Sequence, residues 1–438
     1  MLIRRLFYWF GICILWSGLF CTGCASLPTI NLLPEPVQAV TATPTLLPVP
    51  SPTSQPVAQV TRLHSNAVSL RVWLPPDFNP GGDNPAGKLL QNRLSEFQQQ
   101  RQIHVEVRIK GMEGEGGMIN ALTTANAVAP LALPDVVIMP RTMLEKAALK
   151  GLLYPYDPSS GLLQDPDWFD YTRQLAEIQG NIFGVPLAGD ALILVYRPKI
   201  IGKPARTWEG MLASRYTLLF PAGDSEAKVP IAQYLASGGT MQDADGKPAL
   251  DLAVLTTVFN FFERAQKGEQ MPYWLTQYET DEQAWKAYME NRAPAVITWL
   301  SFFLHTLPQD SDVAIIPTIS GDDFTIMRGW NWALTSNDPS RRKAATELVQ
   351  FMVDSEFSAN WTETAGYLPV QISALKLWEN TKLRTLGERI TASAHASPPS
   401  DITGVLSPIL KDEIVRILKN QTDATEAAQN AVKKLKSP

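Results

Sequence analysis

A proline-rich segment near the start of the chain limits where a folded domain can begin. The stretch from Ala25 to Val60 contains eight prolines among Ser, Thr, Ala, Val and Gln, and Glu35 is its single charged residue. Proline lacks a backbone donor and favours extended polyproline geometry, which rises about 3.1 Å per residue. We therefore predict that residues 24–65 form a tether with a reach on the order of 100 Å, and that the folded protein follows it.

The residues before the tether have the pattern of an export signal. Two arginines precede an apolar run, Leu6 to Phe20, that is too short to be a good transmembrane span. The small residues of "CTG" then stand before Cys24, and this arrangement resembles the bacterial lipobox. The resemblance implies a signal peptide at residues 1–23 and lipidation of Cys24. Two acyl chains on this residue would anchor the protein to a membrane more firmly than one.

Two other interpretations of this segment stay open. Signal cleavage at another site would leave Cys24 as a free thiol. The dibasic start, Arg4-Arg5-Leu6-Phe7, is also similar to a twin-arginine signal, although dibasic starts are common. The first alternative removes the lipid anchor, and the second changes only the export route.

Composition excludes several classes for the folded part. A chain of 438 residues with 45% hydrophobic content can bury one large core and more readily two. The three cysteines, Cys13, Cys21 and Cys24, all lie in the first 24 residues, so the folded part has neither a disulfide framework nor a thiolate metal site. The formal net charge of -5, without a Lys/Arg stripe, argues against nucleic-acid binding.

Hydrophobic patterns after residue 66 predict an α/β fold. Residues 68–74 alternate apolar and polar as a strand does, residues 90–97 carry helical spacing, and residues 103–109 alternate again. This strand, helix and strand predict a parallel pair. The apolar run of "LPDVVIMP" is typical of a strand buried on both faces of a sheet. Further strand candidates, separated by helical patterns, are residues 191–196, 218–220, 295–299 and 313–316.

Six segments, in a fixed order, resemble one protein family. They are "LPDVVIMPRTMLEKAALKGLLYPYD", "GNIFGVPLAGDALILVYRPKI", "PARTWEGM", "DVAIIPTISG", "RGWNWALTSNDPSRRKAATELVQFM" and "TAGYLPVQISAL". Together they resemble the extracellular solute-binding proteins of bacterial ABC importers, in the sugar-binding group that includes maltodextrin-binding protein. The resemblance runs, with gaps, from about Val68 to Leu435, and the last helical patterns are similar to the family's closing helix pair.

The resemblance implies a two-lobed periplasmic-binding-protein fold with a hinge between the lobes. Lobe one would be residues 66–188 plus 318–370, and lobe two residues 189–317 plus 371–438. The implied function is capture of a small solute, expected to be a carbohydrate, and its delivery to the permease of an ABC importer. We expect a monomer outside the cytoplasm, with no cofactor, no metal and no catalytic residue.

Candidate ligand contacts follow from the chemistry of sugars. Sugar sites combine aromatic platforms with carboxylate, amide and Arg partners. Trp73 and Asp77 end the first predicted strand, where open α/β sheets place ligands. By the family resemblance, Asp190 stands at the position of an acidic sugar contact and is the best polar candidate. Arg141 and Thr142 follow "DVVIMP", and the maltodextrin binders have Asp where this chain has Thr142, which argues against maltose itself.

The other candidates are mostly aromatic residues near strand ends. They are Trp299, Phe302, Trp330, Asn331 and Tyr367. Each candidate also has a packing interpretation: Asp190 could be a hinge ion-pair partner, Asp77 could start a turn, and Tyr367 could pack a turn. Three other tryptophans, Trp208, Trp285 and Trp361, are expected in the core.

Two other functions compete with transport. A surface sensor or adhesin could keep the same binding fold without serving an importer. A tethered glycoside hydrolase would need two carboxylates about 5 to 10 Å apart, which a sequence cannot show. The histidines, His64, His104, His305 and His395, lack metal-ligand spacing, and neither a G-x-S-x-G turn nor a phosphate loop is present.

Overall fold

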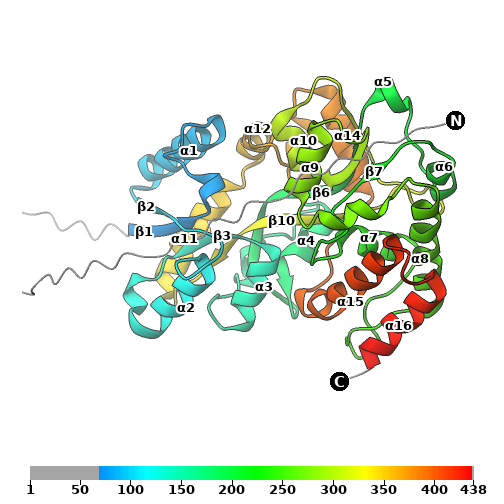
Figure 1. The fold of residues 1–438 in the computed structure, drawn as a ribbon. Helices are drawn as coiled ribbons and strands as arrows, with labels where there is room; N and C mark the ends of the chain where they lie inside the picture. The colour runs from blue at the N-terminus through cyan, green and yellow to red at the C-terminus, as the bar shows by residue number, and fades with distance from the viewer. Residues whose placement is uncertain (1–68, 437–438) are drawn as a thin grey trace, which may run out of the picture. The chain divides into compact units, whose positions relative to one another are not determined.

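One mixed sheet runs through residues 69–436, the part of the chain that the computed structural model describes (Figure 1). Its strand order in this range is β2-β1-β3-β10-β6-β8-β7, with β11 added on β10 and β9 added on β6. The bounds are β1 Ser69–Leu74, β2 His104–Ile109, β3 Val136–Pro140, β6 Gly184–Tyr196, β7 Leu218–Leu219, β8 Ala295–Trp299, β9 Asp312–Ala314, β10 Thr325–Leu334 and β11 Ala394–Ala396. A separate hairpin pairs β4 Glu177–Ile178 with β5 Asn181–Ile182.

Helices connect the strands, as the α/β prediction requires. Those before β8 are α1 Pro85–Arg101, α2 Met118–Val128, α3 Arg141–Leu149, α4 Asp170–Ala176, α5 Pro198–Ile201, α6 Trp208–Leu212, α7 Lys228–Ala236, α8 Leu252–Lys267 and α9 Asp281–Met289. Those after it are α10 Leu300–Thr306, α11 Pro339–Met352, α12 Ser355–Ala365, α13 Ile372–Lys376, α14 Thr381–Ala392, α15 Ser400–Leu418 and α16 Ala424–Lys436.

Local signals explain the first strand, helix and strand. The side chain of Asn84 caps α1 by accepting from the Gly87 amide at 2.6 Å, and Pro85 occupies the first helical position. The buried face of α1 includes Leu90, Leu94 and Phe97, which confirms the predicted stripe. β1 then pairs in parallel with β2 and with β3, as the pattern predicted. The strand in "LPDVVIMP" is β3, and its four apolar residues are fully buried.

Two long strands, β6 and β10, link two halves of the sheet. The first part of β6 pairs antiparallel with β10, whereas Leu192 to Tyr196 pair with β8. β10 also pairs antiparallel with β3. The sequence patterns predicted the second part of β6, as residues 191–196. A third segment joins them where Gly189 and Leu368 exchange backbone hydrogen bonds of 2.8 Å.

Separate hydrophobic cores lie on the two halves of the sheet. Leu70, Ile138 and Trp332 belong to the core around β1, β3 and α1. Leu194 and Ile297 belong to the larger core around β8, α8 and α15. Figure 1 shows β1, β2 and β3 on one side of β10, and β7 and α8 on the other. The expected core tryptophans Trp208, Trp285 and Trp361 are all buried, as predicted.

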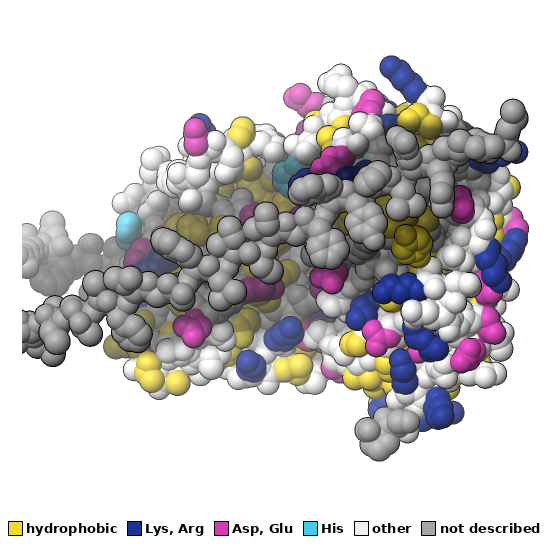
Figure 2. All heavy atoms as spheres, viewed as in Figure 1, with side chains coloured by type: hydrophobic (Ala, Val, Ile, Leu, Met, Phe, Trp, Pro, Cys, Tyr) yellow, Lys and Arg dark blue, Asp and Glu magenta, His cyan; other side chains and the backbone are white. Residues whose placement is uncertain are grey.

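The chain ends in two helices that pack on the larger core. α15 and α16 contact each other and α8, which confirms the predicted closing helix pair. Figure 2 shows basic and acidic side chains interleaved over α15 and α16, and hydrophobic ones over α2. Val128, the last residue of α2, and Leu131, which follows the helix, are 76% and 91% exposed. Within residues 69–436, no helix combines the length and apolar character needed to cross a membrane.

Candidate functional site

A cleft of about 420 Å³ lies along β10, between the end of β3 and the end of β8. Ile326, Arg328 and Trp330 alternate along β10, and all three line the cleft. Residues two apart in a strand point to the same face of the sheet, so one face of β10 forms the floor. A β-bulge directly follows Trp330 in the pairing of β10 with β6. The cleft therefore lies where the two long strands join the two halves of the sheet.

Six of the ten predicted ligand contacts line this cleft. They are Asp77, Arg141, Thr142, Trp299, Trp330 and Tyr367. They come from segments far apart in the sequence, and the ends of β1, β3 and β8 bring them together. This grouping places most of the candidates in one cavity, while their contact with a ligand stays a prediction.

The other four candidates have side chains away from the cleft wall. Trp73 is buried in the core beside β3, with the Lys110 ammonium 4.7 Å from its ring centroid. Phe302 packs against Trp285, with ring centroids 6.0 Å apart. Asn331 is fully buried in β10, and its amide atoms have no hydrogen-bond partner within residues 69–436. Asp190, the fourth, lies beneath Arg328.

Asp190 holds Arg328 in position from behind. The Asp190 carboxylate is 1% exposed and accepts hydrogen bonds from Nε and Nη2 of Arg328 at 3.1 and 2.9 Å. It also accepts from the amide and the hydroxyl of Ser301, at 2.9 and 2.7 Å. Asp190 is thus an ion-pair partner in this structure, the alternative that its sequence position had left open.

Arg328 itself was not among the predicted contacts. Its guanidinium lies over the Trp299 ring, 4.2 Å from the centroid, and its side chain is 45% exposed. A sequence signal for it did exist, because Arg328 stands two residues before Trp330 and so shares its strand face. The structure therefore presents a fixed, charge-paired guanidinium to the cleft, with an aromatic ring beneath it.

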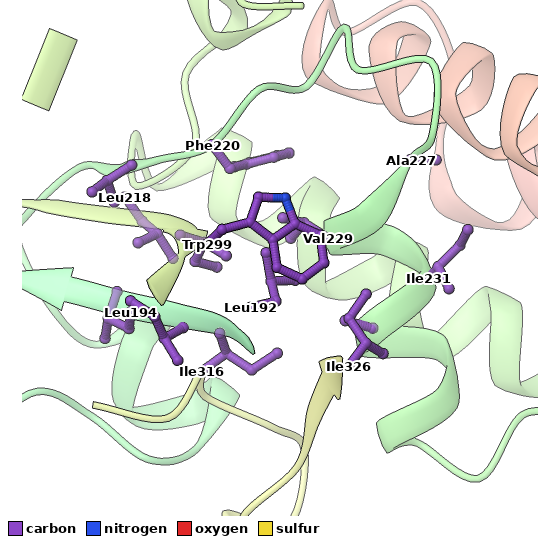
Figure 3. Close-up of a cluster of buried hydrophobic side chains, with 14 of the residues drawn as sticks. Leu192, Leu194, Leu218, Phe220, Ala227, Val229, Ile231, Trp299, Ile316 and Ile326 are labelled. Carbon is purple, nitrogen blue, oxygen red and sulfur yellow. The ribbon is translucent and has the colours of Figure 1, made fainter. Parts of the chain in front are cut away.

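Trp299 is a core residue that reaches the cleft. Figure 3 shows its indole ring surrounded by Leu192, Val229 and Ile326, from three different elements. The side chain is 2% exposed, and its indole N–H has no hydrogen-bond partner among the described residues. Trp299 supports Arg328 more than it offers an open stacking surface.

Trp330 and Tyr367 form the aromatic wall of the cleft. Phe78 packs edge-on against both rings, at centroid distances of 4.8 Å to Trp330 and 5.9 Å to Tyr367. His305 contacts Tyr367 from another side at 5.5 Å. Burial and the nearby carboxylates of Asp190 and Asp77 raise the pKa of the Tyr367 phenol, so it stays neutral. Trp330 is partly exposed and offers the more accessible ring.

Lys228, the first residue of α7, also lines the cleft and is surrounded by carboxylates. Its ammonium lies 2.8 Å from Asp224, 3.1 Å from Glu226 and 3.3 Å from Asp281. Burial lowers the pKa of Lys228, but these three carboxylates outweigh it and raise the pKa above its usual value. Burial raises the pKa of Asp281 despite the nearby lysine. Sequence reasoning missed this cluster because no local pattern marks it.

Arg141 and Glu145 line the cleft from α3. The Arg141 guanidinium donates to the carbonyls of Leu175 and Glu177 at 3.2 and 2.5 Å, and burial lowers its pKa although Glu145 and Glu177 act in the opposite direction. Glu145 accepts from the Ser400 amide at 2.8 Å. Its position one helical turn after Arg141 was the signal that could have revealed it. Sequence reasoning also missed Met112, Glu113, Pro140, Met143, Ile231, Ile326, Gly329, Ser397, Pro398 and Thr403.

The cleft offers hydrogen-bond donors, acceptors and aromatic faces. Within residues 69–436, no group of three or more His, Cys, Asp or Glu side chains is placed to hold a metal ion. Hydroxyl groups of a ligand could donate to the carboxylates and accept from Arg328, while apolar C–H faces could contact Trp330. This combination suits a small hydroxylated molecule.

Comparison with known proteins decides the family. Residues 92–385, more than half of the chain, match the model of a family described as bacterial extracellular solute-binding protein. This chain belongs to that family. Its membership confirms the resemblance seen in the sequence. This solute-binding protein is also 24% identical, over 311 residues, to the maltotriose-binding protein of Pyrococcus abyssi (strain GE5 / Orsay), covering 66% of this chain and 67% of the relative.

Solved structures share the fold of this solute-binding protein. The sugar-binding protein MalE of Xanthomonas citri superposes with a TM-score of 0.69 at 19% identity, covering 84% of this chain and 96% of that one. The maltose-binding periplasmic protein MalE of Listeria monocytogenes, in complex with maltose, gives 0.69 at 14% identity, with 85% and 97% covered. These likenesses confirm the predicted α/β fold with two lobes. The predicted lobe boundaries stay a prediction.

Proposed function

We propose that this solute-binding protein captures a carbohydrate in the cleft along β10 and delivers it to an ABC importer permease. The observation that carries the proposal is the aromatic wall of Trp330 and Tyr367 beside the charge-paired Arg328. Aromatic rings suit the C–H faces of sugars, and fixed polar groups suit their hydroxyls. Relatives named for binding maltotriose or maltose support the same class of ligand.

Capture works as a shift between open and closed forms. A ligand that contacts both lobes only when they are closed binds the closed form more tightly, and this difference in affinity drives closure. The cleft residues come from both halves of the sheet: Arg141 follows β3, and Trp299 ends β8. The permease then receives the closed, loaded monomer. The two proposed lobes are residues 66–188 plus 318–370 and residues 189–317 plus 371–438.

Trp330→Ala should weaken binding of the cognate sugar by about 1–3 kcal/mol, which is roughly 5- to 150-fold in Kd. The loss follows from removing the accessible aromatic platform. A thermal-shift panel of mono-, di- and oligosaccharides and polyols identifies the sugar, and calorimetric titration then measures the affinity. Trp274→Ala is the matched control, because Trp274 is partly buried in the larger core and does not line the cleft. Equal affinities for the wild-type and Trp330→Ala proteins would remove Trp330 from the site.

We also propose that Cys24, which lies outside the described residues, carries lipid and holds the protein at the outer face of the cell membrane. Cys24→Ala should release the protein into the soluble fraction of cells, because the acyl chains supply the membrane affinity. Fractionation with detection of the protein measures this. Membrane retention of the Cys24→Ala variant would contradict the anchor.

Loss of sugar uptake after deletion of the gene separates a transporter component from a sensor or adhesin.

A further inference from the structure

Each cation that lines the cleft already interacts with oxygen atoms of the protein. Arg328 is paired with the buried Asp190, and Lys228 lies within 3.3 Å of the buried carboxylates of Asp224 and Asp281. The Arg141 guanidinium donates to two backbone carbonyls, and the carboxylates of Glu145 and Glu177 compensate its charge. A charged ligand group entering the cleft therefore finds donors, but it finds no cation whose charge is still uncompensated.

Carboxylates outnumber cations around the cleft. Asp77 and Glu113 line it without an ion pair within residues 69–436, and Glu145 accepts from a backbone amide. With Glu226 and the three buried carboxylates behind Arg328 and Lys228, seven carboxylates face three cations. The formal surplus is four negative charges. In a partly desolvated cleft such a surplus repels anions far more strongly than it would in bulk water.

We infer that this cleft selects uncharged hydroxylated solutes and rejects their phosphorylated and carboxylated counterparts. The inference rests on the proposed function, because it defines which carbohydrates the site accepts. A neutral sugar donates hydrogen bonds from its hydroxyls to the carboxylates and accepts from N–H groups of Arg328, and it adds no negative charge to the cleft. A phosphate or uronate would lose its hydration next to the surplus carboxylates without gaining a free cation. Specificity is thus achieved partly by repulsion.

The test compares matched neutral and anionic solutes. Full-chain protein is titrated calorimetrically, at low ionic strength, with glucose and glucose 6-phosphate, galactose and galacturonate, glycerol and glycerol 3-phosphate, and the neutral oligosaccharides of the panel. We expect each neutral solute that binds to do so at least about tenfold more tightly than its anionic counterpart. Higher ionic strength should reduce this preference, because salt screens exposed charges.

A double variant tests the charge account directly. Asp77→Asn combined with Glu226→Gln keeps the hydrogen-bonding shape of two exposed side chains, so both should fold normally. The preference for the neutral solute should fall by about 1.5- to 5-fold for each charge removed. Asp83→Asn, which removes an exposed carboxylate that does not line the cleft, should leave it unchanged.

The outcomes separate the two proposals. An anionic solute that binds as tightly as its neutral counterpart, or more tightly, overturns the inference and leaves carbohydrate binding standing. A neutral preference that the double variant does not reduce overturns the charge account. Failure of every carbohydrate, neutral or anionic, to bind overturns the proposed function and the inference with it.

Discussion

Replacing Trp299 by alanine should lower the free energy of unfolding by about 3–5 kcal/mol, although this residue lines the cleft. The reason is its burial: the indole is 2% exposed and packs within the larger core, against Leu192, Val229 and Ile326. Removing it leaves a cavity that these neighbours cannot fill. Urea denaturation of the wild-type and variant proteins measures the difference. A loss below about 1 kcal/mol would contradict this account of the core.

Trp299→Phe is the informative companion variant. Phenylalanine loses part of the buried ring area, but it also removes an indole N–H that has no partner among the described residues. These two effects are of similar size and opposite sign, so stability should stay within about 1 kcal/mol of wild type. Ligand affinity of this folded variant then shows how much Trp299 contributes through Arg328, whose guanidinium its ring supports.

Asp190→Ala should lower the free energy of unfolding by about 3 kcal/mol. Breaking a buried ion pair leaves the partner charge uncompensated, which costs about 3–5 kcal/mol in well-buried cases. The lower end applies here because the Arg328 side chain is 45% exposed and can regain water. The same variant also leaves the Ser301 amide and hydroxyl without their acceptor. Urea denaturation again provides the measurement.

A double-mutant cycle distinguishes the ion pair from loss of the carboxylate alone. If Asp190 acts through Arg328, the double variant Asp190→Ala with Arg328→Ala should be clearly more stable than the sum of the two single effects predicts. Additive effects would instead assign the loss to Ser301. Asp83→Ala is the control, because Asp83 forms a solvent-exposed pair with Lys88 and should change stability by less than about 1 kcal/mol.

The contrast between Asp190 and Arg328 shows what sequence reasoning could and could not find in the site. Asp190 was selected because the family resemblance places an acidic sugar contact there. In the fold its carboxylate turns inward to Ser301, 111 residues away, and to Arg328, 138 residues away. Local patterns carry no information about partners at such distances. Arg328 takes the exposed position in the cleft because Asp190 and Trp299 hold it there.

Asn331 and Phe302 are two further predicted contacts whose side chains lie away from the cleft, the first because of strand alternation and the second because of helix packing. Asn331 follows Trp330 directly, so the alternation of a strand turns its side chain away from the face that forms the cleft floor. Phe302 lies on α10, where it packs against Trp285 of α9. By contrast, Trp330 and Tyr367 both line the cleft, and their contact with a ligand stays a prediction.

Sequence alone determined the α/β class, the parallel start of the sheet, the resemblance to the family and the neighbourhoods that form the cleft. The class and the sheet pattern depend on hydrophobic period and capping, which are local in the chain, and the resemblance depends on the order of segments along the sequence. Tertiary structure decided which side chain of each neighbourhood faces the cleft and which charge is already paired. That choice depends on long-range contacts at the crossing of β6 and β10, where residues from distant segments compete for the same buried space.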